Sequence, residues 1–187
     1  TWNMGLVVTT NSATLVNKGL EVIEAHLLFD IPFSRIEVTV HPQSVVHSLV
    51  EFHDGSTLAQ ASPPDMRVPI AWGLSWPGRI PDVMPGIDWS QSHTWTFEPL
   101  DEAVFKAVAM AKAAGERGET FPAVFNAANE QAVHAFHRGE IPLPGIIEVI
   151  SHVLDHHQPQ GMSVDAVLEA ERVARDVADA FIAAQRS

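Results

Sequence analysis

The sequence predicts an α+β fold, in which an α/β-type portion with a small sheet is followed by an all-α helical bundle domain. Three observations lead to this prediction. Apolar residues first recur at helical spacing and then alternate with polar ones, an Asp-Gly pair at 54–55 separates two such alternating segments, and the chain beyond residue 100 is alanine-rich with helical periodicity. We expect the first portion over residues 1–75, a connecting linker over 76–99 and the helical bundle over 100–187.

The first helix is expected to begin at Ser12, whose hydroxyl suits a helix N-cap. Residues 6–10 before it fit a short strand or an extended segment. Apolar residues follow at close to the 3.6-residue period: Leu15, Val16, Leu20, Ile23, Leu27 and Leu28. The Asp-Ile-Pro segment at 30–32 ends the helix.

A β section is expected next. Residues 36–40 alternate apolar and polar side chains, and Pro42 interrupts the pattern because proline cannot donate to a central ladder. Residues 45–52 read as a second strand, which the Asp-Gly turn joins to a third at 56–60. A stiff turn at 63–67 closes the section.

The connector at 76–99 is rich in proline and tryptophan, and we expect it to lie against the protein surface because a solvated linker has little use for large aromatic rings. Four helices are expected after it, at 105–114, 123–138, 144–156 and 164–184. The short loops between them predict an antiparallel bundle.

The charge of the chain excludes some broad functions. It carries 11 basic and 23 acidic residues, a net charge of −12 with histidine neutral, whereas a general binder of nucleic acid or anionic membrane needs a positive field. The absence of cysteine excludes disulfides and thiolate metal sites and fits a reducing compartment. No apolar run approaches the roughly 18 residues of a membrane span.

Ser12, Asn17, Lys18 and Glu21 form the most informative group of polar residues. Asn17 and Lys18 stand four and three positions before Glu21, so all three share one helix face. Hydroxyl, amide and ammonium donors near a helix start suit a phosphate, and Glu21 offers a hard oxygen ligand for Mg²⁺ or Mn²⁺. The same spacing also fits a capped helix with an ordinary surface Lys–Glu pair, and the pattern alone does not decide between the two.

Histidines supply two further candidates. His41 and His47 flank the strand break and suit proton carriers or metal ligands, or equally imidazoles hydrogen-bonded at a strand end. His152 and His156, four apart, could chelate a metal, but no acidic third ligand follows at a recognisable spacing. We interpret them, with His157, as solvated residues at a helix end.

Apolar side chains in loops form a fourth candidate. Trp2, Met4 and Met66 lie outside the periodic elements. Such residues can close over a planar ring or a substrate chain, and they can also simply fill the edge of the core.

Several motifs together resemble one known family, 1-deoxy-D-xylulose 5-phosphate reductoisomerase, in order along nearly the whole chain. They are Trp-Asn-Met-Gly at 2–5, Asn-Lys-Gly-Leu-Glu-Val-Ile-Glu-Ala at 17–25, His-Pro-Gln-Ser-Val-Val-His-Ser at 41–48, Asp-Gly-Ser at 54–56, Pro-Asp-Met-Arg at 64–67 and Asn-Ala-Ala-Asn-Glu at 126–130. The combination of the second and third motifs is highly specific. This resemblance favours the phosphate-site interpretation over the ordinary surface pair.

The resemblance implies an oxidoreductase of the non-mevalonate isoprenoid pathway. Such an enzyme rearranges 1-deoxy-D-xylulose 5-phosphate and reduces the resulting aldehyde with NADPH to 2-C-methyl-D-erythritol 4-phosphate, using Mg²⁺ or Mn²⁺. It also implies a homodimer that associates through its catalytic domain, a cytoplasmic bacterial location, a small sugar-phosphate substrate, and no nucleic-acid or membrane partner.

By position in the motifs, Ser12, Asn17 and Lys18 resemble the ligands of the substrate phosphate. Glu21 resembles a metal ligand that also touches the substrate, and with Lys18 it forms the expected catalytic pair. Trp2 resembles the tryptophan of a mobile loop that covers the substrate.

The remaining matches concern the cofactor. Gly5 resembles a position that contacts NADPH, and Met4 and Met66 resemble residues near the nicotinamide. His41 and His47 match family histidines whose role stays open.

The resemblance covers only the carboxy-terminal half of the family. The NADPH-binding Rossmann domain, two further acidic metal ligands and part of the phosphate pocket have no counterpart in these residues. We therefore expect residues 1–75 to be the last part of a catalytic and dimerisation domain, and the chain alone to be a catalytically inactive fragment. The alternative is a stand-alone dimerisation or interaction module in which the Asn-Lys-Gly-Leu-Glu helix is inherited scaffold.

Overall fold

The computed structural model describes residues 5–159 and 161–185. They form two compact units, one made of the chain up to Val38 together with Asp101 onward, and the other of Thr39–Leu100. Each unit is described by itself. These units divide the chain differently from the expected boundaries at 75/76 and 99/100, because the first two helices pack with the carboxy-terminal helices. The assignment of domains stays a prediction.

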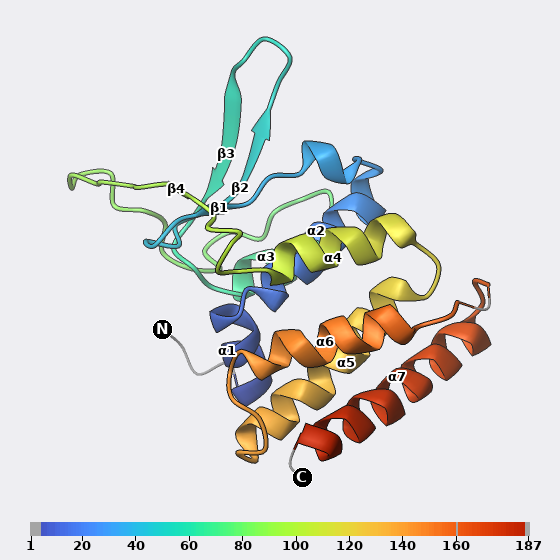
Figure 1. The fold of residues 1–187 in the computed structure, drawn as a ribbon. Coiled ribbons are helices and arrows are strands. Elements are labelled where there is room, and N and C mark those ends of the chain that lie inside the picture. The colour runs from blue at the N-terminus through green and yellow to red at the C-terminus, as the bar shows by residue number, and fades with distance from the viewer. Residues whose placement is uncertain (1–4, 160, 186–187) are drawn as a thin grey trace. The chain divides into compact units, whose positions relative to one another are not determined.

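The first unit is helical. It begins with α1 (Leu6–Ala13), α2 (Val16–Phe29) and a short 3₁₀ turn, Phe33–Arg35. Four more helices follow: α4 (Ala107–Arg117), α5 (Phe121–His137), α6 (Gly145–His156) and α7 (Val164–Gln185). Successive helices from α4 to α7 reverse direction, as an antiparallel bundle requires (Figure 1).

The core of this unit is built around α5, which packs against α6, α7, α4 and α1. Its largest fully buried side chain is Phe125, and Ile146 and Ile150 of α6 are equally inaccessible. The side of α7 that faces the bundle carries small residues, Ala170, Ala174 and Ala178, which let this helix approach closely.

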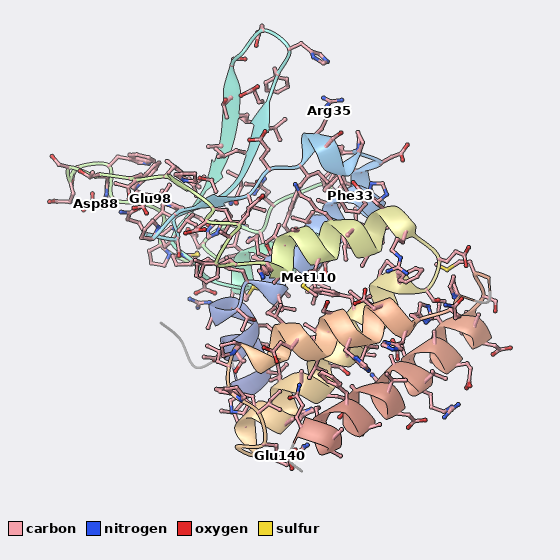
Figure 2. The ribbon with its side chains drawn as sticks, in the orientation of Figure 1. Phe33, Arg35, Asp88, Glu98, Met110 and Glu140 are labelled. Atoms are coloured by element: carbon pink, nitrogen blue, oxygen red, sulfur yellow. The ribbon has the colours of Figure 1, made fainter. Side chains whose placement is uncertain are left out.

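A close contact between α2 and α4 fixes the position of α2. A Cβ atom on Gly19 would lie 2.7 Å from Cβ of Ala111 and 3.2 Å from the Ala107 carbonyl oxygen. Only glycine fits this approach without movement of one helix. Gly115 of α4 plays a similar part, because a Cβ atom at this position would collide with the ring of Phe33. Figure 2 shows Phe33 beside α4.

The second unit contains four strands and one helix. Strand β1 (Thr39–Val40) pairs antiparallel with β4 (Glu98–Pro99), and β2 (Val46–Glu51) pairs antiparallel with β3 (Thr57–Ala61). Helix α3 (Arg67–Ser75) follows the hairpin. Asp54 closes the hairpin turn by accepting hydrogen bonds from the amide and hydroxyl of Ser56 at 2.9 and 2.6 Å.

All residues of the second unit are described, and none of them is fully buried. Two of the three connector tryptophans, Trp76 and Trp89, are about 70% exposed, whereas Trp95 is half-buried. Trp89 meets only Trp95 and His93 edge-on among aromatic rings. Other connector residues contact the rest of the unit, since the Arg79 guanidinium lies over the Trp72 ring and the Phe97 ring stacks on His41. The expectation that the connector lies against the protein surface stays a prediction.

The predicted start of the first helix is wrong. Residues 6–10 are helical rather than extended, although four of the five are valine or threonine, residue types that favour strands. The Thr9 and Thr10 hydroxyls donate back to the carbonyls of Gly5 and Leu6, which keeps them compatible with a helix. The chain then breaks at Thr14–Leu15, and α2 begins at Val16, so Ser12 lies in the last turn of α1 and is not an N-cap.

The β section is predicted in part. The hairpin strands and their turn are confirmed, and so are the four late helices within a few residues. The strand expected at 36–40 is reduced to two residues. Helix α3 is not expected from the sequence, because the prolines before it indicate a turn. Pro69 stands in its first helical turn, where a missing amide proton costs nothing. The α+β class with a following helical bundle is confirmed.

No helix in the described ranges is both long and apolar enough to span a bilayer.

Substitution of Gly19 tests the close packing of α2 on α4. We expect Gly19→Ala to lower the free energy of unfolding by about 1–3 kcal/mol, because the added methyl group meets a side chain and a backbone carbonyl that cannot turn away. Thermal and denaturant unfolding measure the change.

Gly73→Ala is the matched control, because Gly73 is also helical but has nothing within 4 Å of the added Cβ. This control should be neutral or stabilise by up to about 1 kcal/mol, as alanine favours helices. Equal effects of the two substitutions would contradict the packing argument.

Candidate functional site

The start of α2 carries the central group of predicted site residues. Leu15, immediately before the helix, has a left-handed backbone with φ of 61°, which is uncommon for a bulky residue. Its side chain provides no cap, so no side chain satisfies the first amides of α2. An uncapped helix start leaves its N–H groups available to an anion.

Asn17, Lys18 and Glu21 are brought together on the face of this helix. The Asn17 amide donates to one oxygen of Glu21 at 2.5 Å, and the Lys18 ammonium donates to the other. The Lys18 and Glu21 side chains are 40% and 44% exposed, so both groups remain accessible. The adjacency predicted from spacing is present; the functional roles stay predictions.

Ser12 lies in α1, on the other side of the break between helices α1 and α2 at Thr14–Leu15. Its hydroxyl is exposed and donates to the Val8 carbonyl at 2.9 Å, as helical serines commonly do. The backbone links it to the break, because the Leu15 amide donates to the Ser12 carbonyl at 3.3 Å. Ser12 therefore lies at a helix end rather than a helix start, and its hydroxyl must rotate to meet a ligand.

Two predicted residues, Trp2 and Met4, lie outside the described residues. Gly5 is described: it is exposed, has a φ of 80°, and precedes α1. Its carbonyl accepts hydrogen bonds from the amide and hydroxyl of Thr9 at 3.1 and 2.8 Å.

The described residues do not form a complete metal site. No group of three or more histidine, aspartate and glutamate side chains gathers in a way that would hold an ion in this part of the chain. Glu21 supplies one hard oxygen group, whereas Mg²⁺ prefers an octahedral set of oxygens. Any magnesium or manganese site that includes Glu21 needs further ligands from beyond these residues.

His41 and His47 both belong to the second unit and both have backbone partners. Nδ1 of His41 lies 2.8 Å from the Thr96 carbonyl and its ring stacks on Phe97, while Nε2 is buried without a partner. His47 lies at an irregularity in the β2–β3 register, with Nε2 3.0 Å from the Ser62 carbonyl. These contacts fit the hydrogen-bonded alternative.

The late histidines lie on and after α6. His156 points Nδ1 at the His152 carbonyl, 2.7 Å away, and the His152 ring stacks on Phe181. Burial is the main cause that lowers the pKa of His152 and of His157. His157 is not a simple solvated residue, because its Nε2 lies 2.7 Å from the Thr120 hydroxyl.

Met66 is exposed at the start of α3, where its neighbours Asp65 and Arg67 form a tight pair. The Asp65 carboxylate accepts hydrogen bonds from the Arg67 amide and guanidinium at 2.9 Å. The side-chain hydrogen bond from Arg67 is the main cause that lowers the pKa of Asp65 to about 2, and the same contact raises the pKa of Arg67. The pair fixes the turn from which Met66 projects.

Sequence reasoning missed two features of the first unit. Gly19 lies inside the most specific motif, but the pattern of that motif does not indicate the close contact of Gly19 with α4. The hydrogen bond between Thr10 and His137 joins residues 127 positions apart, and no local pattern could indicate it.

Fold and site together define a class: an α+β domain with a helical bundle, in which hydroxyl, amide, ammonium and carboxylate groups gather about an uncapped helix start. The model of one family, described as the DXP reductoisomerase C-terminal domain, matches residues 61–177. A second model, the 1-deoxy-D-xylulose 5-phosphate reductoisomerase C-terminal domain, matches residues 1–29. The chain belongs to the DXP reductoisomerase C-terminal domain family, and the resemblance inferred from the motifs is confirmed.

Individual relatives agree. A 1-deoxy-D-xylulose 5-phosphate reductoisomerase of Leifsonia xyli subsp. xyli is 63% identical over 183 residues, which is 97% of this chain and 51% of the relative. A solved reductoisomerase of Zymomonas mobilis in complex with NADPH is 42% identical with a TM-score of 0.89, over 94% of this chain and 47% of that one.

Another solved structure, a DOX-P reductoisomerase in complex with NADPH, fosmidomycin and magnesium, is 38% identical with a TM-score of 0.92. It matches 100% of this chain and 48% of its own length. The chain thus spans about half the length of the relatives it matches.

The Asp65–Arg67 pair yields a test by titration. We expect NMR titration to give Asp65 a pKa of about 2. Arg67→Gln should raise the pKa toward the usual range of about 4, because the guanidinium donor is lost while the backbone amide donor remains. Asp54, whose pKa is lowered by Ser56, is the internal reference and should not respond. An unchanged Asp65 titration in the variant would contradict the assigned cause.

Proposed function

We propose that this chain is the carboxy-terminal half of an enzyme that rearranges 1-deoxy-D-xylulose 5-phosphate and reduces it to 2-C-methyl-D-erythritol 4-phosphate with NADPH and a divalent metal ion. Membership of the family supports the proposal. The observation that carries it is local: Asn17 and Lys18 both donate to Glu21 beside the uncapped start of α2.

The phosphate of the substrate is proposed to bind at the break between α1 and α2. The first amides of α2 and the side chains of Asn17 and Lys18 would donate to its oxygens, and Ser12 would add a hydroxyl from the end of α1. A left-handed Leu15 stores backbone strain at this point, and strained residues are concentrated at ligand sites. Binding a group far from the reacting carbons supplies energy to orient the substrate.

Glu21 is proposed to give one oxygen ligand to Mg²⁺ or Mn²⁺ and to touch the substrate. The metal, when bound, would stabilise negative charge on the substrate oxygens. One Glu21 oxygen accepts a hydrogen bond from Asn17 and the other accepts one from Lys18. A phosphate that draws these donors away would free the carboxylate for a cation.

The cofactor contacts are proposed on the motifs. Gly5 and Met66, with Met4, would lie near NADPH, and Trp2 would belong to a loop that covers the substrate. The remaining cofactor and metal contacts would come from the other half of the enzyme.

We also propose a homodimer in the cytoplasm of a bacterium, as the family resemblance implies. The open surface of the second unit supports association, since Leu49, Val50, Phe52 and Leu58 of the hairpin are 45–64% exposed. Large exposed apolar patches commonly mark protein interfaces.

The alternative, a stand-alone dimerisation module, draws on the same exposed hairpin and on the incomplete metal set in the described residues. The two proposals differ in what the polar face of α2 does. An inherited scaffold would tolerate changes at Lys18 and Glu21, whereas half of an active site would not.

The first test uses the chain by itself. We expect the purified 187-residue chain not to oxidise NADPH in the presence of sugar phosphate and Mg²⁺, because a single carboxylate does not hold a catalytic metal. The complete enzyme, assayed in parallel by absorbance, is the positive control and should turn over. Oxidation of NADPH by the chain alone would overturn the proposed division of the site.

The second test separates the two roles in the complete enzyme. Lys18→Ala should raise KM for the sugar phosphate roughly tenfold to hundredfold, as expected for a lost hydrogen bond to a charged group, with a smaller change in kcat. Glu21→Gln should lower kcat by about two orders of magnitude and weaken the dependence on metal, because a charged ligand is lost.

Lys106→Ala and Glu24→Gln are the matched controls for this test, since both residues are exposed and lie outside the proposed site. Steady-state kinetics at varied substrate and metal concentrations give the readout. A metal titration that Glu21→Gln leaves unchanged would remove Glu21 from the ligand set.

A further inference from the structure

One hydrogen bond joins helix α1 to the helical bundle. The Thr10 hydroxyl lies 2.8 Å from Nε2 of His137, which ends α5, and Thr10 is only 5% exposed. Every other side-chain hydrogen bond that the described residues of α1 make is local to that helix. The bond therefore links the segment that carries Ser12 to the most buried helix of the unit.

The imidazole of His137 is the donor in this hydrogen bond. Thr10 has a single hydroxyl proton, which it donates to the Leu6 carbonyl at 2.9 Å. Its oxygen consequently accepts from His137, so Nε2 of His137 carries a proton. Both the neutral ring in this tautomer and the charged ring keep that proton, and protonation of His137 does not break the bond.

Helix α1 needs an anchor of this kind. It has eight residues, fewer than an isolated helix requires in water, and none of its apolar side chains is fully buried. Its two buried residues, Thr10 and Asn11, are polar. The helix is thus held by a polar contact in place of an apolar face.

Thr10 and Ser12 are two positions apart on this helix, which places their side chains about 200° apart around its axis. Thr10 faces the bundle while Ser12 is exposed. A contact that holds Thr10 therefore fixes the rotation of α1 about its axis and its position along that axis, and both determine where Ser12 lies.

We propose that His137 is a positioning residue for phosphate binding, acting through Thr10 to hold Ser12 in place beside the start of α2. This inference rests on the proposed function, in which Ser12 contacts the substrate phosphate. It assigns to the helical bundle a specific part in substrate capture.

The experiment compares variants of the complete enzyme in steady-state kinetics and in hydrogen exchange of the α1 amides. His137→Leu and Thr10→Val should each raise KM for the sugar phosphate roughly tenfold, leave kcat within about twofold, and speed exchange in α1. KM for NADPH should stay unchanged.

Conservative variants provide the rescue. His137→Gln keeps an N–H donor and Thr10→Ser keeps the hydroxyl, so both should stay near the wild-type KM. The double variant Thr10→Val with His137→Leu should recover part of the loss, because removing both partners leaves no buried polar group unpaired.

A wild-type KM in both His137→Leu and Thr10→Val would overturn the proposal, even with faster exchange in α1. So would equal effects of His137→Leu and His137→Gln, because the donor would then be irrelevant. If the wild-type enzyme does not use the sugar phosphate, the proposed function itself fails. The exchange measurement needs no substrate, so the two failures are distinguishable.

Discussion

The close approach of α2 to α4 is the contact on which the geometry of the candidate site depends. Gly19 has no side chain, so the Cβ of Ala111 and the carbonyl of Ala107 lie directly against its backbone. One face of α2 is thereby committed to the core, and the polar face that carries Lys18 and Glu21 is left open. The absence of a side chain at Gly19 therefore determines that Lys18 and Glu21 lie on the face of α2 that is open to solvent.

The second constraint is the break between α1 and α2. A continuous helix would cover the first amides of α2 with its own carbonyls, whereas the left-handed Leu15 ends one helix and starts another without a cap. The strain at Leu15 is tolerated because both helices are fixed elsewhere, α2 through Gly19 and α1 through Thr10 and His137. The rigid parts of the unit thus maintain an unfavourable backbone at the point where an anion is proposed to bind.

Local patterns predicted the late helices, the hairpin and the shared face of Asn17, Lys18 and Glu21, because helical periodicity, turn chemistry and short spacings are local properties. The break at Leu15 could not be predicted, since leucine at that position continues the apolar period and its left-handed backbone results from packing. The helical conformation of Thr10 could not be predicted either. Its β-branched side chain favours a strand, and the hydrogen bonds of its hydroxyl depend on the fold. The two groups of site residues fall in different units, and no pattern in the sequence places one group against the other.

The two units differ in how they are stabilised, and this difference bears on the proposed function. The first unit contains every fully buried apolar side chain of the described residues, whereas the second buries none. A two-stranded hairpin is marginal in water unless its apolar side chains are covered. The exposed leucines and valines of the hairpin therefore have no apolar partner within the second unit, which agrees with the proposal that this surface belongs to an interface.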